Sequence, residues 1–178
     1  MTSALLVMDV QEAVVARYPD AAYLPRLAEA IAAAREAGTP VIYVTVGFRP
    51  GAPEVSVNNR MFGRLRGTPH HANPIHAAVA PRDGDIVVTK RRVSAFAGSD
   101  LDLVLRAGGI DHLILTGIAT SGVVLSILRE AADRDFRLTV LADGCLDNDP
   151  EVHRVLTGKV FPAQADVITV AEFAGVAN

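Results

Sequence analysis

The sequence predicts an α/β protein, a three-layer αβα sandwich built on a six-stranded parallel sheet of the Rossmann-like kind. Short apolar runs alternate along the chain with longer segments of helical periodicity. The apolar runs are nearly uninterrupted, which is typical of strands covered on both faces. Glycine- and proline-containing turns separate the two kinds of segment. The chain has 178 residues, so we expect a single domain over 1–178.

The predicted strands are short runs rich in aliphatic and β-branched residues. They lie, in chain order, at 4–8, 41–46, 85–89, 112–116, 137–141 and 166–170. Turn signals at 38–40, 82–84 and 108–109 precede the second, third and fourth runs. The last run is the weakest of the six.

Amphipathic helices are predicted between these runs. They lie at 23–37, after Ser99-Asp100, at 121–133 and after Asp149-Pro150. Gly38 is a plausible C-cap for the first helix. Asp149 is a capping acid placed before a first-turn proline, which is typical of a helix start.

The segment 48–81 departs from this alternation. It is rich in Gly, Pro, Asn, Arg and His and has weak periodicity. A connection of this length inside a compact domain is usually functional, so we predict a lid or binding loop. The alternative is a mobile insertion without a role in binding.

Composition excludes several classes of protein. Half of the residues are hydrophobic and 21% are charged, which argues against a disordered chain. The formal net charge is −3, so neither a nucleic acid nor an anionic membrane is an expected partner. The first nine residues lack the basic start of a signal peptide, and we expect a cytoplasmic protein. The single cysteine excludes an intramolecular disulfide.

Candidate functional residues follow the predicted strands, because ligands of open parallel sheets bind beyond the carboxyl ends of the strands. Asp9 follows the first run, with Gln11 close by, and Lys90 follows the third. An aspartate at such a turn is often only a helix cap, and a lysine after a strand is often only solvated. If the two side chains meet across the sheet edge, they form an ion pair that tunes the carboxylate.

The sequence does not support a dinucleotide-binding site, a P-loop or a metal site. The residues after the first run, 9–14, contain no glycine, so a dinucleotide fingerprint and a P-loop are both absent. The histidines do not show a convincing metal-ligand spacing. We therefore expect no cofactor and no metal.

An ordered series of short motifs nevertheless resembles a known family. The motifs are Leu6-Val7-Met8-Asp9-Val10-Gln11, Lys90 with Ser94-Ala95-Phe96, Thr116-Gly117-Ile118-Ala119-Thr120-Ser121-Gly122-Val123-Val124, Ala131-Ala132-Asp133, Ala142-Asp143 and His153. Their order and spacing resemble the isochorismatase-like hydrolases, also called the cysteine hydrolase superfamily. The resemblance runs over essentially the whole chain and implies the isochorismatase fold.

The resemblance also implies a site. Asp9 and Lys90 fall on two of the three catalytic positions of the family, and Val123 falls on that of the nucleophilic cysteine. It further implies a cis peptide between Ile118 and Ala119, and an oxyanion hole formed by the backbone N–H groups of Ala119 and Val123. Valine has no nucleophilic atom, so the thiol route is closed at this position. Cys145 is expected to be a buried, inert thiol.

Three functions remain open. In the first, Asp9 is a general acid on an enol ether or related bond of a small acidic metabolite, and Lys90 binds a substrate carboxylate or orients Asp9, as true isochorismatases imply. In the second, the chain is a binding or regulatory member of the family that has lost catalysis. In the third, Asp9 activates water for amide hydrolysis.

Substrate contacts are expected from the turns and from the long segment. The predicted substrate-binding residues are Gln11, Phe48, Arg49, Phe62, Phe96 and Thr120. Further arginines that could bind substrate carboxylates are Arg60, Arg64, Arg66, Arg91 and Arg92. The expected partner is a small-molecule substrate. A homodimer or larger homo-oligomer is expected from the family resemblance.

Overall fold

A computed structural model describes residues 2–69 and 72–177. Its centre is a six-stranded sheet in the order β3-β2-β1-β4-β5-β6, and every neighbouring pair is parallel. The strands are β1 (Ser3–Met8), β2 (Val41–Val46), β3 (Ile86–Lys90), β4 (His112–Ile118), β5 (Arg137–Leu146) and β6 (Asp166–Ile168). The predicted fold class is confirmed.

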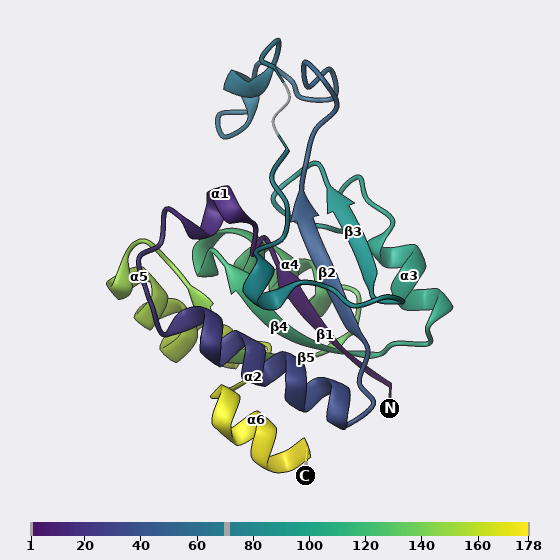
Figure 1. The fold of residues 1–178 in the computed structure, drawn as a ribbon, viewed down its shortest axis with the longest axis vertical. Helices are drawn as coiled ribbons and strands as arrows, with labels where there is room; N and C mark the ends of the chain where they lie inside the picture. Colours follow the sequence, from purple (N-terminus) through teal and green to yellow (C-terminus); the bar gives the residue numbers. More distant parts are fainter. Residues whose placement is uncertain (1, 70–71, 178) are drawn as a thin grey trace.

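Helices cover both faces of this sheet (Figure 1). The α-helices are α1 (Glu12–Val15), α2 (Tyr23–Glu36), α3 (Leu101–Ala107), α4 (Leu125–Ala132), α5 (Pro150–Val155) and α6 (Val170–Ala177). Asp149 caps α5 as expected, because its carboxylate accepts hydrogen bonds from the amides of Glu151 and Val152.

The alternation of side chains along β1 produces the three layers. Leu6 and Met8 belong to one buried cluster, which contains the apolar residues of α3 and α4. Leu5 and Val7 belong to a second cluster, which contains those of α2. Since all four side chains are at most 1% exposed, the near-continuous apolar run reflects burial on both faces.

The strand order creates a switch point between β1 and β4, where the chain changes the direction in which it adds strands. The two strands approach closely there. Gly117 of β4 has φ +140°, and a Cβ at this position would lie 2.3 Å from the carbonyl oxygen of Met8. The glycine therefore permits the contact that brings the two strand ends together.

Some predicted boundaries were wrong. β5 continues to Leu146, so the Asp143–Cys145 stretch lies inside the strand rather than after it. The helix expected at 121–133 is regular only from Leu125, because Thr120–Val124 form a wide π-turn in which Gly122 has non-helical angles. The strand expected at 166–170 ends at Ile168, and α6 begins at Val170.

The described part of the segment 48–81 contains no strand, and residues 49–69 project as a lobe beyond the carboxyl ends of the strands (Figure 1). The returning chain is fastened to the start of α1. The Glu12 amide donates to the Pro74 carbonyl at 2.9 Å, and the His76 amide donates to the Val10 carbonyl at 2.9 Å. The base of the lobe is thus fixed to the body of the protein.

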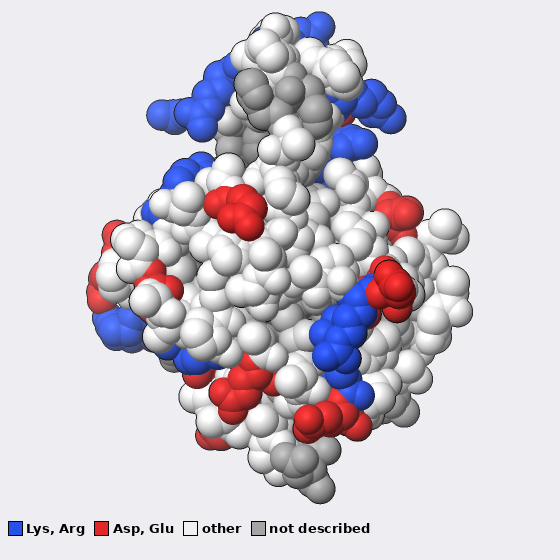
Figure 2. Space-filling model, in the orientation of Figure 1, with Lys and Arg blue, Asp and Glu red and all other residues white. Residues whose placement is uncertain are grey.

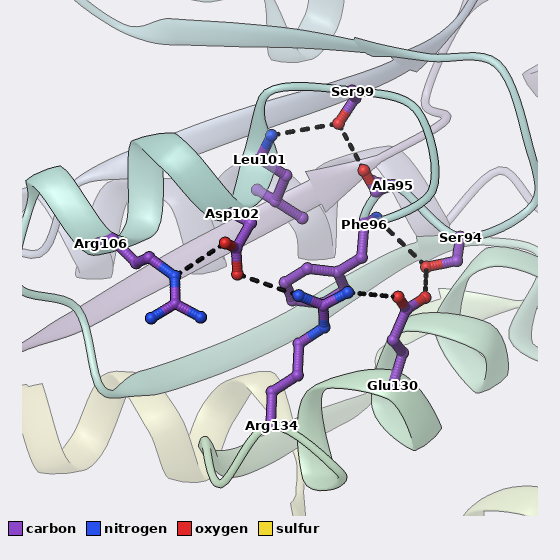
Figure 3. A network of polar contacts seen from close by, with 9 residues as sticks. All are labelled: Ser94, Ala95, Phe96, Ser99, Leu101, Asp102, Arg106, Glu130 and Arg134. Carbon is purple, nitrogen blue, oxygen red and sulfur yellow. Dashed lines mark hydrogen bonds and ion pairs between the residues drawn. The ribbon is translucent and has the colours of Figure 1, made fainter.

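A polar network fixes the chain that follows Lys90 (Figure 3). Ser94 donates a hydrogen bond to Glu130 of α4. The guanidinium of Arg134 bonds to Glu130 at 2.7 Å and to Asp102 of α3 at 3.1 Å. It also lies over the ring of Phe96, with 4.5 Å between its central carbon and the ring centroid. These contacts join the 91–100 segment to α3 and α4.

In the part of the chain that the structure describes, none of the helices has the length and apolar character needed to cross a membrane.

Candidate active site

Asp9 follows β1 and Lys90 ends β3. Their side chains meet although β2 lies between these two strands in the sheet. Lys90 Nζ lies 3.0 Å from Asp9 Oδ2 and also donates to the carbonyl oxygen of Arg92 at 3.1 Å. Both residues are buried, Lys90 at 2% exposed and Asp9 at 8%. Asp9 Oδ1 is buried and has no hydrogen-bond partner among the described residues. One carboxylate oxygen is thus held by an ammonium group and the other remains available.

Burial controls the acidity of Asp9. Loss of hydration raises the pKa of its carboxyl group, and the net value is about 6 against an ordinary value of 3.8. The Lys90 ammonium lowers that pKa through its charge and its hydrogen bond, but by less than burial raises it. A carboxyl group with a pKa near 6 can donate or accept a proton near neutral pH, as acid–base catalysis requires.

The turn after β4 lies beside this pair. The peptide bond between Ile118 and Ala119 is cis. The amide of Ser121 donates to Asp147 Oδ2 at 2.7 Å, which anchors the outer side of the turn. Val123, which is 2% exposed, faces the same cavity as Asp9.

A cavity of about 950 Å³ opens at this edge of the sheet. Its lining includes the ion pair, the turn after β4 and the inner side of the lobe. The lining residues include Asp9, Arg17, Phe48, Arg49, Phe62, Arg64, Lys90, Ala119 and Val123. The volume fits a small molecule rather than a polymer.

Four of the six predicted substrate-binding residues line the cavity, namely Gln11, Phe48, Arg49 and Phe62. Phe48 and Phe62 line it together, with 5.1 Å between their ring centroids. Arg49 also lines it and lies 3.6 Å from Glu54 Oε1. These side chains bring an apolar wall and a cation to the side of the cavity formed by the lobe.

Gln11 lines the cavity as well, but its amide is used for structure. Its Nε2 donates to the carbonyl oxygens of Val46 and Asn73, and its Oε1 accepts from the Val46 amide. Gln11 thus holds the end of β2 and the returning chain of the lobe, and its expected contact with substrate stays a prediction.

Phe96 and Thr120 are not among the residues that line the cavity. The Phe96 ring packs between Arg134 and Phe136 in the core. Thr120 is fully buried, and its hydroxyl pairs with His153 Nδ1 at 2.8 Å. In the structure these two side chains hold the segments beside the site, and their expected contacts with substrate stay predictions.

The sequence did not single out Arg17, Tyr18 or Asn73, which all line the cavity. Arg17 and Tyr18 follow the short helix α1, whose start lies just after Asp9. Their position soon after the first strand could have indicated them, because that connection begins at the carboxyl edge of the sheet.

The single cysteine lies away from this chemistry. Cys145 is within β5, is 3% exposed and is not among the cavity-lining residues. Burial raises the pKa of its thiol to about 12. A thiol of this kind is not a thiolate at neutral pH.

The described residues contain no group of three or more His, Cys, Asp or Glu side chains that could hold a metal ion. The expectation that no metal takes part stays a prediction.

Fold and cavity together define an α/β protein with a small-molecule site at the switch point of a parallel sheet. The chain belongs to the isochorismatase family of hydrolases, because residues 3–172 match the isochorismatase domain.

Individual relatives agree with this family. The chain is 34% identical over 202 residues to the ureidoacrylate amidohydrolase RutB of Methylobacterium radiotolerans, covering 97% of this chain and 78% of that protein. It is 33% identical over 178 residues to the isochorismatase family protein YecD of Escherichia coli O157:H7, covering 96% and 94%.

Solved structures show the same fold. An isochorismatase family protein from Burkholderia thailandensis superimposes with a TM-score of 0.87 at 28% identity, covering 99% of this chain and 95% of that one. The N-carbamoylsarcosine amidase of Thermoplasma acidophilum superimposes with a TM-score of 0.75 at 26% identity, covering 96% and 97%.

Proposed function

We propose that this protein is a hydrolase that works without a thiol nucleophile and uses Asp9 as its proton-transferring group. The observation that carries the proposal is the composition of the cavity wall. Val123 stands there at the position that we assign to the family cysteine, while the single cysteine is buried in β5. A carboxyl group with a pKa of about 6 is left as the reactive side chain beside Val123.

The reaction that fits this site best is hydrolysis of an enol ether in a small acidic molecule. Asp9 donates its proton to the terminal carbon of the C=C bond, and the ether carbon becomes an oxocarbenium ion. Water adds to that carbon and returns a proton to the Asp9 carboxylate. The hemiketal then breaks its C–O bond and yields a ketone and an alcohol, so no covalent enzyme intermediate is needed.

The other groups of the site have supporting roles in this proposal. Lys90 orients Asp9 by holding Oδ2, which leaves Oδ1 to carry the proton. The backbone amides of Ala119 and Val123 stabilise the negative charge that develops on the departing alcohol oxygen when the hemiketal breaks its C–O bond, since backbone donors do not depend on the side chain. We also propose that residues 1–178 act as one domain, with the lobe as the lid of its site.

Removing the cysteine tests the thiol-independent route. We expect Cys145→Ala to keep kcat/KM within about twofold, because Cys145 contributes packing rather than chemistry. Pyruvate release from isochorismate is the first assay, with circular dichroism as a check on folding. As a matched variant, Val123→Cys should react with iodoacetamide while the parent protein does not. A folded Cys145→Ala protein without activity would refute the proposal.

Hydrolysis of an amide by Asp9-activated water is a second candidate, because several relatives bear the name ureidoacrylate amidohydrolase. The dependence of kcat/KM on pH separates the two. A general acid must be protonated, so enol-ether hydrolysis should fall as pH rises through about 6. A general base must be ionised, so amide hydrolysis should rise through the same pH. Tight binding of both substrates without turnover would instead favour a binding protein.

A further inference from the structure

The cavity is cationic although the whole chain is not. The formal net charge of the chain is −3. Among the described residues that line the cavity, Arg17, Arg49, Arg64 and Lys90 are cationic, and Asp9 is the single carboxylate. The cavity therefore offers more positive charge than its own wall neutralises.

Most of the arginines near the cavity already have partners. Arg66 donates to the carbonyl oxygens of Pro53 and Val55. Arg92 donates to that of Glu54, and Arg91 donates to that of Gly47. These three guanidinium groups hold the lobe and its connection to β3, so they are engaged in structure rather than waiting for a ligand.

Two guanidinium groups in the lining remain. Lys90 is paired with Asp9, and Arg49 lies near Glu54. The guanidinium groups of Arg17 and Arg64 have no hydrogen-bond or ion-pair partner in residues 2–69 and 72–177. Arg17 comes from the turn after α1, whereas Arg64 comes from the 3-10 turn Gly63–Leu65 in the lobe. Figure 2 shows how Lys and Arg side chains gather on that lobe.

Burial gives the cavity two chemically different ends. Asp9 and Lys90 are buried, whereas Arg17 and Arg64 are exposed. Asp9 and Lys90 thus belong to the buried part of the cavity wall, and Arg17 and Arg64 belong to its solvent-exposed part. Both residues line the same cavity, Arg17 from the body of the protein and Arg64 from the lobe.

We infer that Arg17 and Arg64 form an anion subsite that binds a carboxylate of the substrate away from the bond that is cleaved. The inference rests on the proposed function, because Asp9 defines the reacting end. It specifies the substrate class as a small dicarboxylate whose second acid group points to the mouth of the cavity. Guanidinium groups suit this role because their parallel N–H donors match a carboxylate.

Calorimetric binding of unreactive probes tests the subsite without turnover. The probes are the straight-chain dicarboxylates from malonate to adipate, each compared with its monomethyl ester at low ionic strength. We expect at least one dicarboxylate to bind about tenfold more tightly than its ester, because the second carboxylate gains charge-assisted hydrogen bonds. The preference should weaken as salt is added.

Variants test whether Arg17 and Arg64 cause the preference for a dicarboxylate over its ester. Arg17→Met and Arg64→Met should each reduce it at least about threefold, and the double variant should abolish it. Arg17→Lys should restore part of it, since the charge remains without the fork. Arg82→Met is the matched control, because Arg82 is an exposed arginine outside the lining. It should behave as the parent protein.

The subsite is overturned if the double variant keeps the preference of the parent, or if no dicarboxylate binds more tightly than its ester. Failure of the proposed function gives a different result. A protein that prefers dicarboxylates through Arg17 and Arg64 but hydrolyses neither enol ethers nor amides would retain the subsite and lose the hydrolase proposal.

Discussion

Asp9→Asn is expected to lower kcat/KM for enol-ether hydrolysis by at least about a hundredfold, because an amide cannot supply the proton that the reaction consumes. The substitution suits the backbone. Asp9 has φ 57°, and asparagine is among the few side chains that adopt this left-handed conformation readily. The backbone is therefore not strained by the substitution, although the buried Lys90 ammonium loses its counterion, so the activity of the folded protein is the quantity to compare.

Pyruvate release from isochorismate measures the effect, with thermal unfolding recorded in parallel. Asp83→Asn is the matched control, because Asp83 is exposed and outside the cavity lining. It should leave kcat/KM unchanged. If the folded Asp9→Asn protein is as active as the parent, Asp9 is not the acid and the proposed mechanism is wrong.

Lys90→Met is expected to destabilise the protein by about 3–5 kcal/mol at pH 8, because it leaves a buried carboxylate without its counterion. The loss should be smaller at pH 5. There Asp9, with a pKa of about 6, is mostly protonated even in the parent, so the charge attraction to Lys90 is largely absent.

The sign of this pH dependence follows from proton binding. Burial raises the pKa of Asp9, so the folded state holds a proton that the unfolded state releases, and stability falls as pH rises from about 4 to 6. Without the Lys90 ammonium the pKa rises further, and this window extends to higher pH. The difference between parent and variant must therefore grow above pH 6.

Urea unfolding at pH 5 and at pH 8 measures the loss of unfolding free energy at each pH. Lys159→Met is the matched control, because Lys159 is the only other lysine of the chain and its side chain is exposed. It should change the unfolding free energy by less than about 0.5 kcal/mol at either pH. An equal loss for Lys90→Met at pH 5 and pH 8 would mean that Lys90 stabilises by packing rather than by charge.

Burial and the charge of Lys90 act on the pKa of Asp9 in opposite directions. A nearby ammonium by itself lowers the pKa of a carboxyl group, which leaves the group ionised at neutral pH and without a proton to donate. In this structure burial has the larger effect, so the pKa of Asp9 stays near 6 although Lys90 Nζ lies 3.0 Å from its carboxylate. The depth of the site, rather than the identity of its residues, decides this balance.

The sequence alone determined the strands, the layers and the two ends of the ion pair. β1, β2 and β4 are buried on both faces, and each therefore has a nearly continuous apolar run that can be read from its own short segment of sequence. Asp9 and Lys90 could be identified because the carboxyl ends of parallel strands meet at one edge. The boundaries of β5 and α4 were misjudged, since the π-turn before α4 leaves no simple periodicity.

Only the tertiary structure decided which side chains share the cavity. Phe96 and Thr120 looked like site residues but pair with Arg134 and His153 instead. Arg17, by contrast, reaches the cavity from a turn that showed no motif. The physical reason is that periodicity records how each segment faces the core, whereas the contacts of a loop side chain depend on segments far away in the chain. The pKa of Asp9 belongs to the same class, because burial is a property of the assembled fold.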